Sequence, residues 1–153
     1  MLFRSKFTGL APRGIISPIA VNAFFYYRFI LEGTFTEAGQ LINKIKVIPR
    51  RSNDPVFSGD IFIVDGSWRI HSADLTITKD QQLEFVDTFR IRQSNIDVGS
   101  GKWMPFNSTL YFHFNLFGFQ GSGDILGVFK DYNLTPGFRS EEHTSELQSP
   151  DHL

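Results

Sequence analysis

The chain has 153 residues, a formal net charge of −1 and no cysteine. The lack of cysteine excludes a disulfide framework, a thiolate metal site and a cysteine nucleophile. The near-neutral charge argues against nucleic acid as a partner, because domains that bind nucleic acid are usually strongly basic. Seventeen phenylalanines are enough to bury a sizeable core in one domain.

Strand-like segments separated by turn signals follow one another along the chain. Residues 18–23 favour one short helical turn, because Pro18 suits the first position of a helix. Residues 25–36 are rich in Phe, Tyr, Ile and Thr, which suit a strand. A tight turn predicted at residues 37–40 leads into a second strand that ends at Pro49.

The next predicted strands cover residues 56–64 and 68–78, and they flank a strong hairpin signal at Asp65-Gly66-Ser67. Residues 83–93 then alternate between apolar and polar side chains. This alternation predicts one face with Phe85, Phe89 and Ile91 and an opposite face with Thr88, Arg90 and Arg92.

The longest alternating run covers residues 103–119, and residues 124–133 return the chain. No stretch shows a sustained helical period. We therefore predict an all-β fold: a curved, half-barrel-like antiparallel meander sheet over residues 24–134, with at most one or two short helical turns. The side chains expected to be mostly buried are Ile61, Ile63, Phe85, Phe89, Phe112 and Phe114.

Candidates for catalysis are weak. His71 and His113 each lie alone on a strand, whereas a catalytic zinc site usually has three protein ligands. Asp60, Asp74 and Asp87 are candidates for an acid–base pair, but we expect them at separate points of the meander. Structural pairing is the favoured interpretation, with Lys44, Lys46, Arg69 or Arg90 as partners. We predict no enzymatic activity and no catalytic, cofactor-binding or metal site.

The last fifteen residues, 139–153, differ from the rest of the chain. Residues 139–149 resemble the translation of a common short-read sequencing adapter without a mismatch, so we expect this tail to be non-native and not to pack. The tail carries one Arg against three Glu and one Asp, which leaves about +2 on residues 1–138. The predicted organisation is an N-terminal lead-in (1–16), an antiparallel β domain cut from a larger protein (17–138), and the tail.

A series of short phrases runs through residues 17–138 in a fixed order. They cover residues 17–23 (SPIAVNA), 27–33, 41–50 (LINKIKVIPR), 53–59 (NDPVFSG), 61–65 (IFIVD), 68–72 (WRIHS), 85–88 and 103–105. The phrases resemble a family of large outer-membrane proteins from Bacteroidota. In that family a carboxypeptidase-regulatory-like domain precedes a domain of unknown function, which ends in a predicted outer-membrane β-barrel. Val21 departs from the family's Asp, which weakens any role for that position.

The same stretch resembles, more loosely, the curved sheet of periplasmic lipoprotein carriers. The shared pattern is a strand that ends in Pro49, followed by a hairpin whose turn carries Asp65. A half-closed sheet with a Phe-lined inner face offers an apolar pocket for acyl chains. The alternative is that the same phenylalanines pack against a helix or against the rest of the chain.

These resemblances imply a non-enzymatic cell-envelope domain on the periplasmic side of the outer membrane. Its expected role is lipid or lipoprotein handling, transport or barrel support. The expected partners are the rest of its own chain, including a downstream barrel, and lipid or lipoprotein; no cofactor is expected. The alternative is a carbohydrate-binding or carbohydrate-active β-sandwich. Two carboxylates about 5–10 Å apart in an open cleft would favour that alternative.

Overall fold

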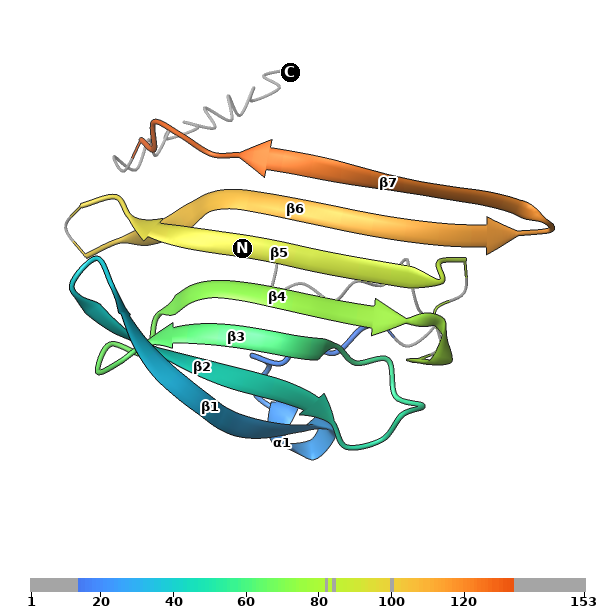
Figure 1. The fold of residues 1–153 in the computed structure, drawn as a ribbon, viewed down its shortest axis with the longest axis horizontal. Helices are drawn as coiled ribbons and strands as arrows, with labels where there is room; N and C mark the ends of the chain where they lie inside the picture. Colours follow the sequence, from blue (N-terminus) through green and yellow to red (C-terminus); the bar gives the residue numbers. More distant parts are fainter. Residues whose placement is uncertain (1–13, 82, 84, 100, 134–153) are drawn as a thin grey trace, which may run out of the picture.

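The computed structural model describes residues 14–81, 83, 85–99 and 101–133, and their strands form one antiparallel sheet (Figure 1). Its seven strands lie in chain order, so each is hydrogen-bonded only to its neighbours in sequence. Their bounds are β1 Tyr27–Glu37, β2 Gln40–Pro49, β3 Ser58–Val64, β4 Ile70–Thr78, β5 Thr88–Asp97, β6 Trp103–Leu116 and β7 Phe119–Val128. The predicted all-β meander is confirmed.

Helical structure within the described residues is limited to α1 (Ala23–Tyr26) and the short 3-10 turn η2 (Lys79–Gln81). The helical turn therefore begins at the end of the predicted segment, residues 18–23. The predicted tight turn between β1 and β2 is confirmed: Ala38 and Gly39 both have positive φ, 48° and 76°, as two-residue hairpin turns require.

The hairpin between β3 and β4 is wider than predicted. Trp68 lies in the turn, with φ of 57° and a side chain that is 79% exposed, and β4 begins only at Ile70. Two hydrogen bonds explain the difference. Trp68 N–H donates to the carbonyl of Val64 at 3.1 Å, and Val64 N–H donates to the carbonyl of Arg69 at 2.9 Å. The loop therefore ends at Arg69, and Trp68 is not part of β4.

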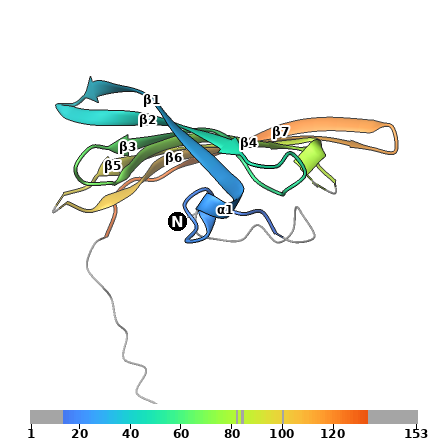
Figure 2. The ribbon, with the colours of Figure 1, turned by 90° about the horizontal axis from the view of Figure 1, so that it is seen from below.

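The core lies between one face of the sheet and residues 14–26, which we call the N-terminal segment. Figure 2 shows α1 and this segment against that face. Ile15 and Ala23 of the segment are buried there, and Ile16 N–H donates to the carbonyl of Pro55 at 3.0 Å. We call this side the apolar face; its buried strand residues include Val47, Ile61, Leu75, Ile77, Phe89 and Ile91.

Tyr27 fastens the N-terminal segment to the sheet from the centre of this core. Its side chain is fully buried. The hydroxyl donates to the carbonyl of Ile16 and accepts from the backbone N–H of Phe57 at 3.0 Å. Burial raises the pKa of the Tyr27 hydroxyl far above its usual value.

The predicted core is largely correct. Ile61 and Phe89 are buried, and Ile63 and Phe112 pack against the core. Phe114 is half-buried and Phe85 is exposed. The prediction for Phe85 was wrong because this residue lies in a bend before β5 begins at Thr88, so strand alternation does not apply to it. The predicted non-packing tail lies outside the described residues.

The sheet is twisted, and β1 and β2 are turned away from the direction of β5–β7 (Figure 1). Register shifts occur between Leu31 and Gly33, between Phe62 and Ile63, and between Ser94 and Asn95. Such bulges increase the local twist of a strand pair.

Candidate functional site

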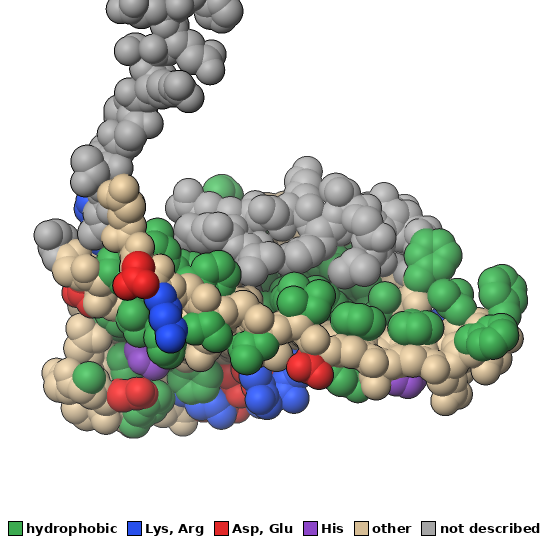
Figure 3. Space-filling view, turned by 90° about the horizontal axis from the view of Figure 1, so that it is seen from above, with side chains coloured by type: hydrophobic (Ala, Val, Ile, Leu, Met, Phe, Trp, Pro, Cys, Tyr) green, Lys and Arg blue, Asp and Glu red, His purple; other side chains and the backbone are tan. Residues whose placement is uncertain are grey.

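The side of the sheet opposite the apolar face carries a ladder of charged side chains, which we call the charged face. Figure 3 shows hydrophobic side chains along one side of the sheet and groups of basic and acidic side chains along the other. Lys44 Nζ lies 2.8 Å from Glu32 and 3.5 Å from Asp60, and Lys46 Nζ lies 3.4 Å from Glu32. The hydrogen bond from Lys44 lowers the pKa of Glu32.

The row of charged side chains continues with Asp74 on β4. Arg90 donates two hydrogen bonds to its carboxylate, at 2.7 and 2.6 Å, and Arg92 donates a third at 3.1 Å. The hydrogen bonds from Arg90 are the main cause of the lowered pKa of Asp74. Asp74 is therefore ionised at neutral pH and serves an ion-pair network.

Asp60 and Asp74 are direct partners in the β3–β4 register. The expectation that these carboxylates lie at separate points of the meander was therefore wrong, because antiparallel pairing brings them opposite each other. Their predicted pairing with Lys44, Lys46 and Arg90 is confirmed. Glycosidases need one carboxyl group that stays protonated through a raised pKa. The pKa of Asp74 is lowered instead, so Asp74 does not meet this requirement.

The remaining candidates from the sequence lie beside other polar side chains. Asp87 lies 3.3 Å from Lys79 and 3.6 Å from His113, rather than beside one of its predicted partners. His71 lies 3.9 Å from Glu37. Within the described residues, no group of three or more His, Asp or Glu side chains is arranged to hold a metal ion.

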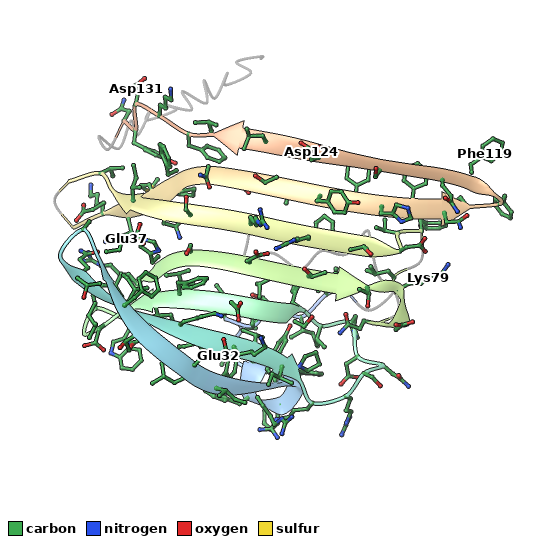
Figure 4. All side chains as sticks on the ribbon, viewed as in Figure 1. Glu32, Glu37, Lys79, Phe119, Asp124 and Asp131 are labelled. Atoms are coloured by element: carbon green, nitrogen blue, oxygen red, sulfur yellow. The ribbon has the colours of Figure 1, made fainter. Side chains whose placement is uncertain are left out.

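A groove lies on the charged face between β4 and β7. Its volume is about 400 Å³, and three threonines contribute to its lining. Asp124, on β7, is its outermost acidic residue (Figure 4). The full lining is Thr76, Thr88, Arg90, Arg92, Thr109, Tyr111 and Asp124.

A second cavity, of about 480 Å³, lies where the β3–β4 loop meets β5, β6 and the N-terminal segment. We call it the tryptophan cavity, because Trp68 and Trp103 both line it. Its polar residues are Arg69, Gln93 and Asn95; the other apolar residues are Ile19, Ile63, Ile70, Met104 and Pro105. Two polar atoms of these residues, Gln93 Oε1 and Trp103 Nε1, have almost no accessible surface and no hydrogen-bond partner among the described residues.

β7 forms one edge of the sheet and exposes apolar side chains on both of its faces. Ile125 pairs with Leu110 on the apolar face and is 59% exposed, whereas Leu126 pairs with Thr109 on the charged face and is 63% exposed. Phe119 projects from the tip of the β6–β7 hairpin (Figure 4). This edge offers both hydrogen-bonding groups and apolar surface to a further strand.

Comparison with known families gives a match to a family of unknown function, DUF5686, over residues 2–132. The chain belongs to this family. Searches of curated proteins and of solved structures found no match. The family assignment agrees with the domain of unknown function expected from the sequence, and it assigns no reaction or ligand. No helix among the described residues is long and apolar enough to cross a membrane.

Sequence reasoning missed the tryptophan cavity. Trp68, Gln93 and Trp103 come from three separate segments, and only the β4–β5–β6 register brings them together. The chain contains only two tryptophans, and both line this cavity. Their proximity, however, depends on the bulge that shifts the β5–β6 register beside Asn95.

Proposed function

We propose that this chain is a non-enzymatic cell-envelope domain of a larger outer-membrane protein, in which a further strand of the same protein pairs with β7. The role of the domain is to support the barrel that follows it. The observation that carries the proposal is the unprotected β7 edge, whose apolar side chains are exposed on both faces of the sheet.

Edge strands of independent domains usually carry features that discourage pairing, such as charges, prolines or bulges. β7 has no proline and a single charged residue, Asp124. Its ladder with β6 runs without a register shift from Asn107↔Val128 to Leu116↔Phe119. A regular strand of ten residues with exposed apolar side chains on both faces is suited to the interior of a wider sheet.

The two faces of the sheet also suit an envelope domain that handles apolar partners. The apolar face is covered in part by the N-terminal segment. The charged face presents charged side chains to solvent on the opposite side. The carbohydrate-active alternative lacks comparable support, because the paired carboxylates of Asp60 and Asp74 are engaged with lysines and arginines.

The direct test compares residues 1–138 with a version extended through the native downstream sequence, both in detergent. We expect the short version to self-associate and the extended version to insert into membranes and to unfold at higher temperature. A short version that is a soluble, cooperative monomer, together with an extension that neither enters membranes nor adds stability, would contradict the proposal.

A matched pair of variants tests the role of the edge. Leu126→Lys with Val128→Lys places two charges on β7, where both side chains are more than half exposed, and should increase the monomeric fraction several-fold. Phe25→Lys makes the same kind of change on α1, away from the edge, at a side chain that is 81% exposed. If both changes suppress association equally, general stickiness rather than β7 pairing is responsible.

A further inference from the structure

We infer that the strand that pairs with β7 presents a lysine or an arginine to Asp124 on the charged face and large apolar side chains on the apolar face. The inference rests on the proposed function and deepens it, because it gives the chemistry of the partner strand. It is drawn from the distribution of charges across the sheet, from the composition of β6 and β7, and from apolar side chains that are exposed at this edge.

Carboxylates on the charged face lie beside cations of a neighbouring strand. Lys44 Nζ, on β2, lies 2.8 Å from Glu32 on β1 and 3.5 Å from Asp60 on β3. Arg92 Nε, on β5, lies 3.1 Å from Asp74 on β4. Opposite charges on adjacent strands stabilise a strand pair when they are direct or diagonal partners. Each of these three carboxylates therefore has a cation across a strand pair.

Asp124 on β7 differs from these three carboxylates (Figure 4). It is exposed and forms no ion pair with a described residue. Its neighbouring strand β6 contains no lysine or arginine. Asp124 pairs with Tyr111 on β6, and the histidine of that strand, His113, lies beside Asp87 instead. A cation on the open side of β7 would complete the pattern that the other strands follow.

A second copy of β7 does not supply that cation. The sequence of β7, FQGSGDILGV, has no lysine or arginine. The nearest lysine, Lys130, comes after the last pair of the β6–β7 ladder, Asn107↔Val128. Two β7 strands paired about a two-fold axis near Asp124 would bring two like charges together, which is unfavourable. We therefore assign the edge to a strand of different sequence.

The apolar face of β7 favours apolar side chains on the incoming strand. Ile125 is 59% exposed there, and Phe112 and Phe114 on β6 are only half-buried. Side chains of adjacent strands pack against each other on one face of a sheet. Aliphatic or aromatic side chains of the partner strand would therefore cover these three residues. The partner strand alternates, with its basic residue on one face and its apolar residues on the other.

A lone charge on an edge strand can instead discourage pairing. The two roles predict opposite effects when the charge is removed. If Asp124 attracts the partner strand, Asp124→Asn weakens the binding of a strand that carries a cation. If Asp124 repels strands in general, the same substitution strengthens the binding of every strand.

Synthetic strands test the inference on the full chain. Each fluorescein-labelled peptide is as long as β7, alternates threonine with valine, and carries lysine, glutamine or glutamate at one central threonine position. Fluorescence anisotropy measures the affinities at a protein concentration below that at which the chain self-associates. We expect affinity to fall from the lysine to the glutamine to the glutamate peptide, by roughly two- to fivefold at each step, which is the effect of one cross-strand charge pair. The differences should shrink in about 1 M salt, which screens exposed charges.

Charge reversal identifies the residue that is responsible. Asp124→Lys should reverse the order, so that the glutamate peptide binds most tightly, and Asp124→Asn should make the three affinities equal. Asp80→Lys is the matched control, because it changes the net charge equally at an exposed residue of η2, between β4 and β5; it should keep the wild-type order. Circular dichroism verifies the fold of each variant, and the wild-type peptide series remains decisive if a variant fails to fold.

The outcomes separate the inference from the proposed function. Equal affinity of the wild type for all three peptides, or tighter binding of all three to Asp124→Asn, would overturn the inference and leave β7 as a pairing edge. Absence of binding for every peptide would reject the proposed β7 edge together with the inference. A stable dimer of the chain that excludes the peptides would identify a second copy as the occupant and would also overturn the inference.

Discussion

The ring of Phe112 on β6 lies over Gly123, its direct partner on β7. A Cβ atom placed on Gly123 would lie 2.8 Å from Phe112 Cζ. Phe114 and Gly121 repeat the relationship two pairs further along, where the added Cβ would lie 2.5 Å from Phe114 Cζ. The glycines of the edge strand thus leave room for two phenylalanine rings, which cover backbone that would otherwise face water.

This packing predicts that Gly123→Ala destabilises the sheet although alanine suits a strand better than glycine. The methyl group would displace the Phe112 ring, at a cost of about 1–2 kcal/mol in the free energy of unfolding. Urea denaturation measures the change. Gly33→Ala is the matched control, because an added Cβ there meets no atom within 4 Å; equal losses from both substitutions would contradict the account.

Gly59 tolerates an added Cβ less well than Gly123, because the atoms nearest to that Cβ belong to the backbone rather than to a side chain. Its φ is 137°, and an added Cβ would lie 2.1 Å from the carbonyl oxygen of Asp74. The β3–β4 ladder fixes that carbonyl. We expect Gly59→Ala to cost more than about 3 kcal/mol in unfolding free energy and to lower the yield of folded protein. A loss no larger than that of Gly123→Ala would show that the ladder can move.

Tyr27→Phe should release the N-terminal segment. Removal of the hydroxyl removes its hydrogen bonds with the carbonyl of Ile16 and the N–H of Phe57, at a cost of about 1–3 kcal/mol in unfolding free energy. Hydrogen exchange should become faster at Ile16, whose N–H is bonded to Pro55. Tyr26→Phe is the control, and exchange rates that stay unchanged at Ile16 would contradict the fastening role.

The same residue predicts a loss of stability at alkaline pH. The pKa of Tyr27 is raised in the folded state by burial, whereas an unfolded tyrosine ionises near pH 10. The folded state therefore keeps the proton that the unfolded state releases, so stability falls as pH rises above about 10. Thermal unfolding of Tyr27→Phe should show a smaller decline over this range than the wild type.

Asp74→Asn should remove a modest, pH-dependent contribution. The carboxylate and its arginines are partly exposed to solvent, so we expect a loss of about 0.5–1 kcal/mol in unfolding free energy at pH 7. Because Arg90 lowers the pKa of Asp74 in the folded state, this contribution is present above about pH 4 and is lost as pH falls. Wild type and variant should converge in acid; a constant difference would exclude the ion pairs as its source. Asp124→Asn, on the same face but without a described ion pair, is the control.

Strand alternation predicted much of this structure because one face of the sheet is buried and the other is charged. It separated Phe89 and Ile91 from Arg90 and Arg92 correctly, and turn residues located the break at Ala38 and Gly39. The pairing of Asp60 with Asp74 across β3 and β4 could not be predicted from alternation. Register between strands depends on the β3–β4 loop and on the bulge beside Phe62, which alternation within one strand does not specify.

The tryptophan cavity also depends on contacts between strands, which alternation within one strand does not specify. Aromatic and apolar residues at strand ends are expected in any core, so Trp68 and Trp103 carried no separate signal. Their proximity depends on the positive φ of Trp68 and on the β4–β5–β6 register. These features exist only once three segments have been brought together.

The order of the strands has a consequence for how the molecule assembles. Each strand is hydrogen-bonded to strands that are its neighbours in sequence. No strand therefore needs a distant segment of the chain in order to pair. Short loops close quickly and at low entropic cost, so the sheet can grow one hairpin at a time as the chain emerges from the ribosome. The N-terminal segment alone closes a longer loop, through Ile16 and Val56, and its docking should follow the formation of β1 and β2.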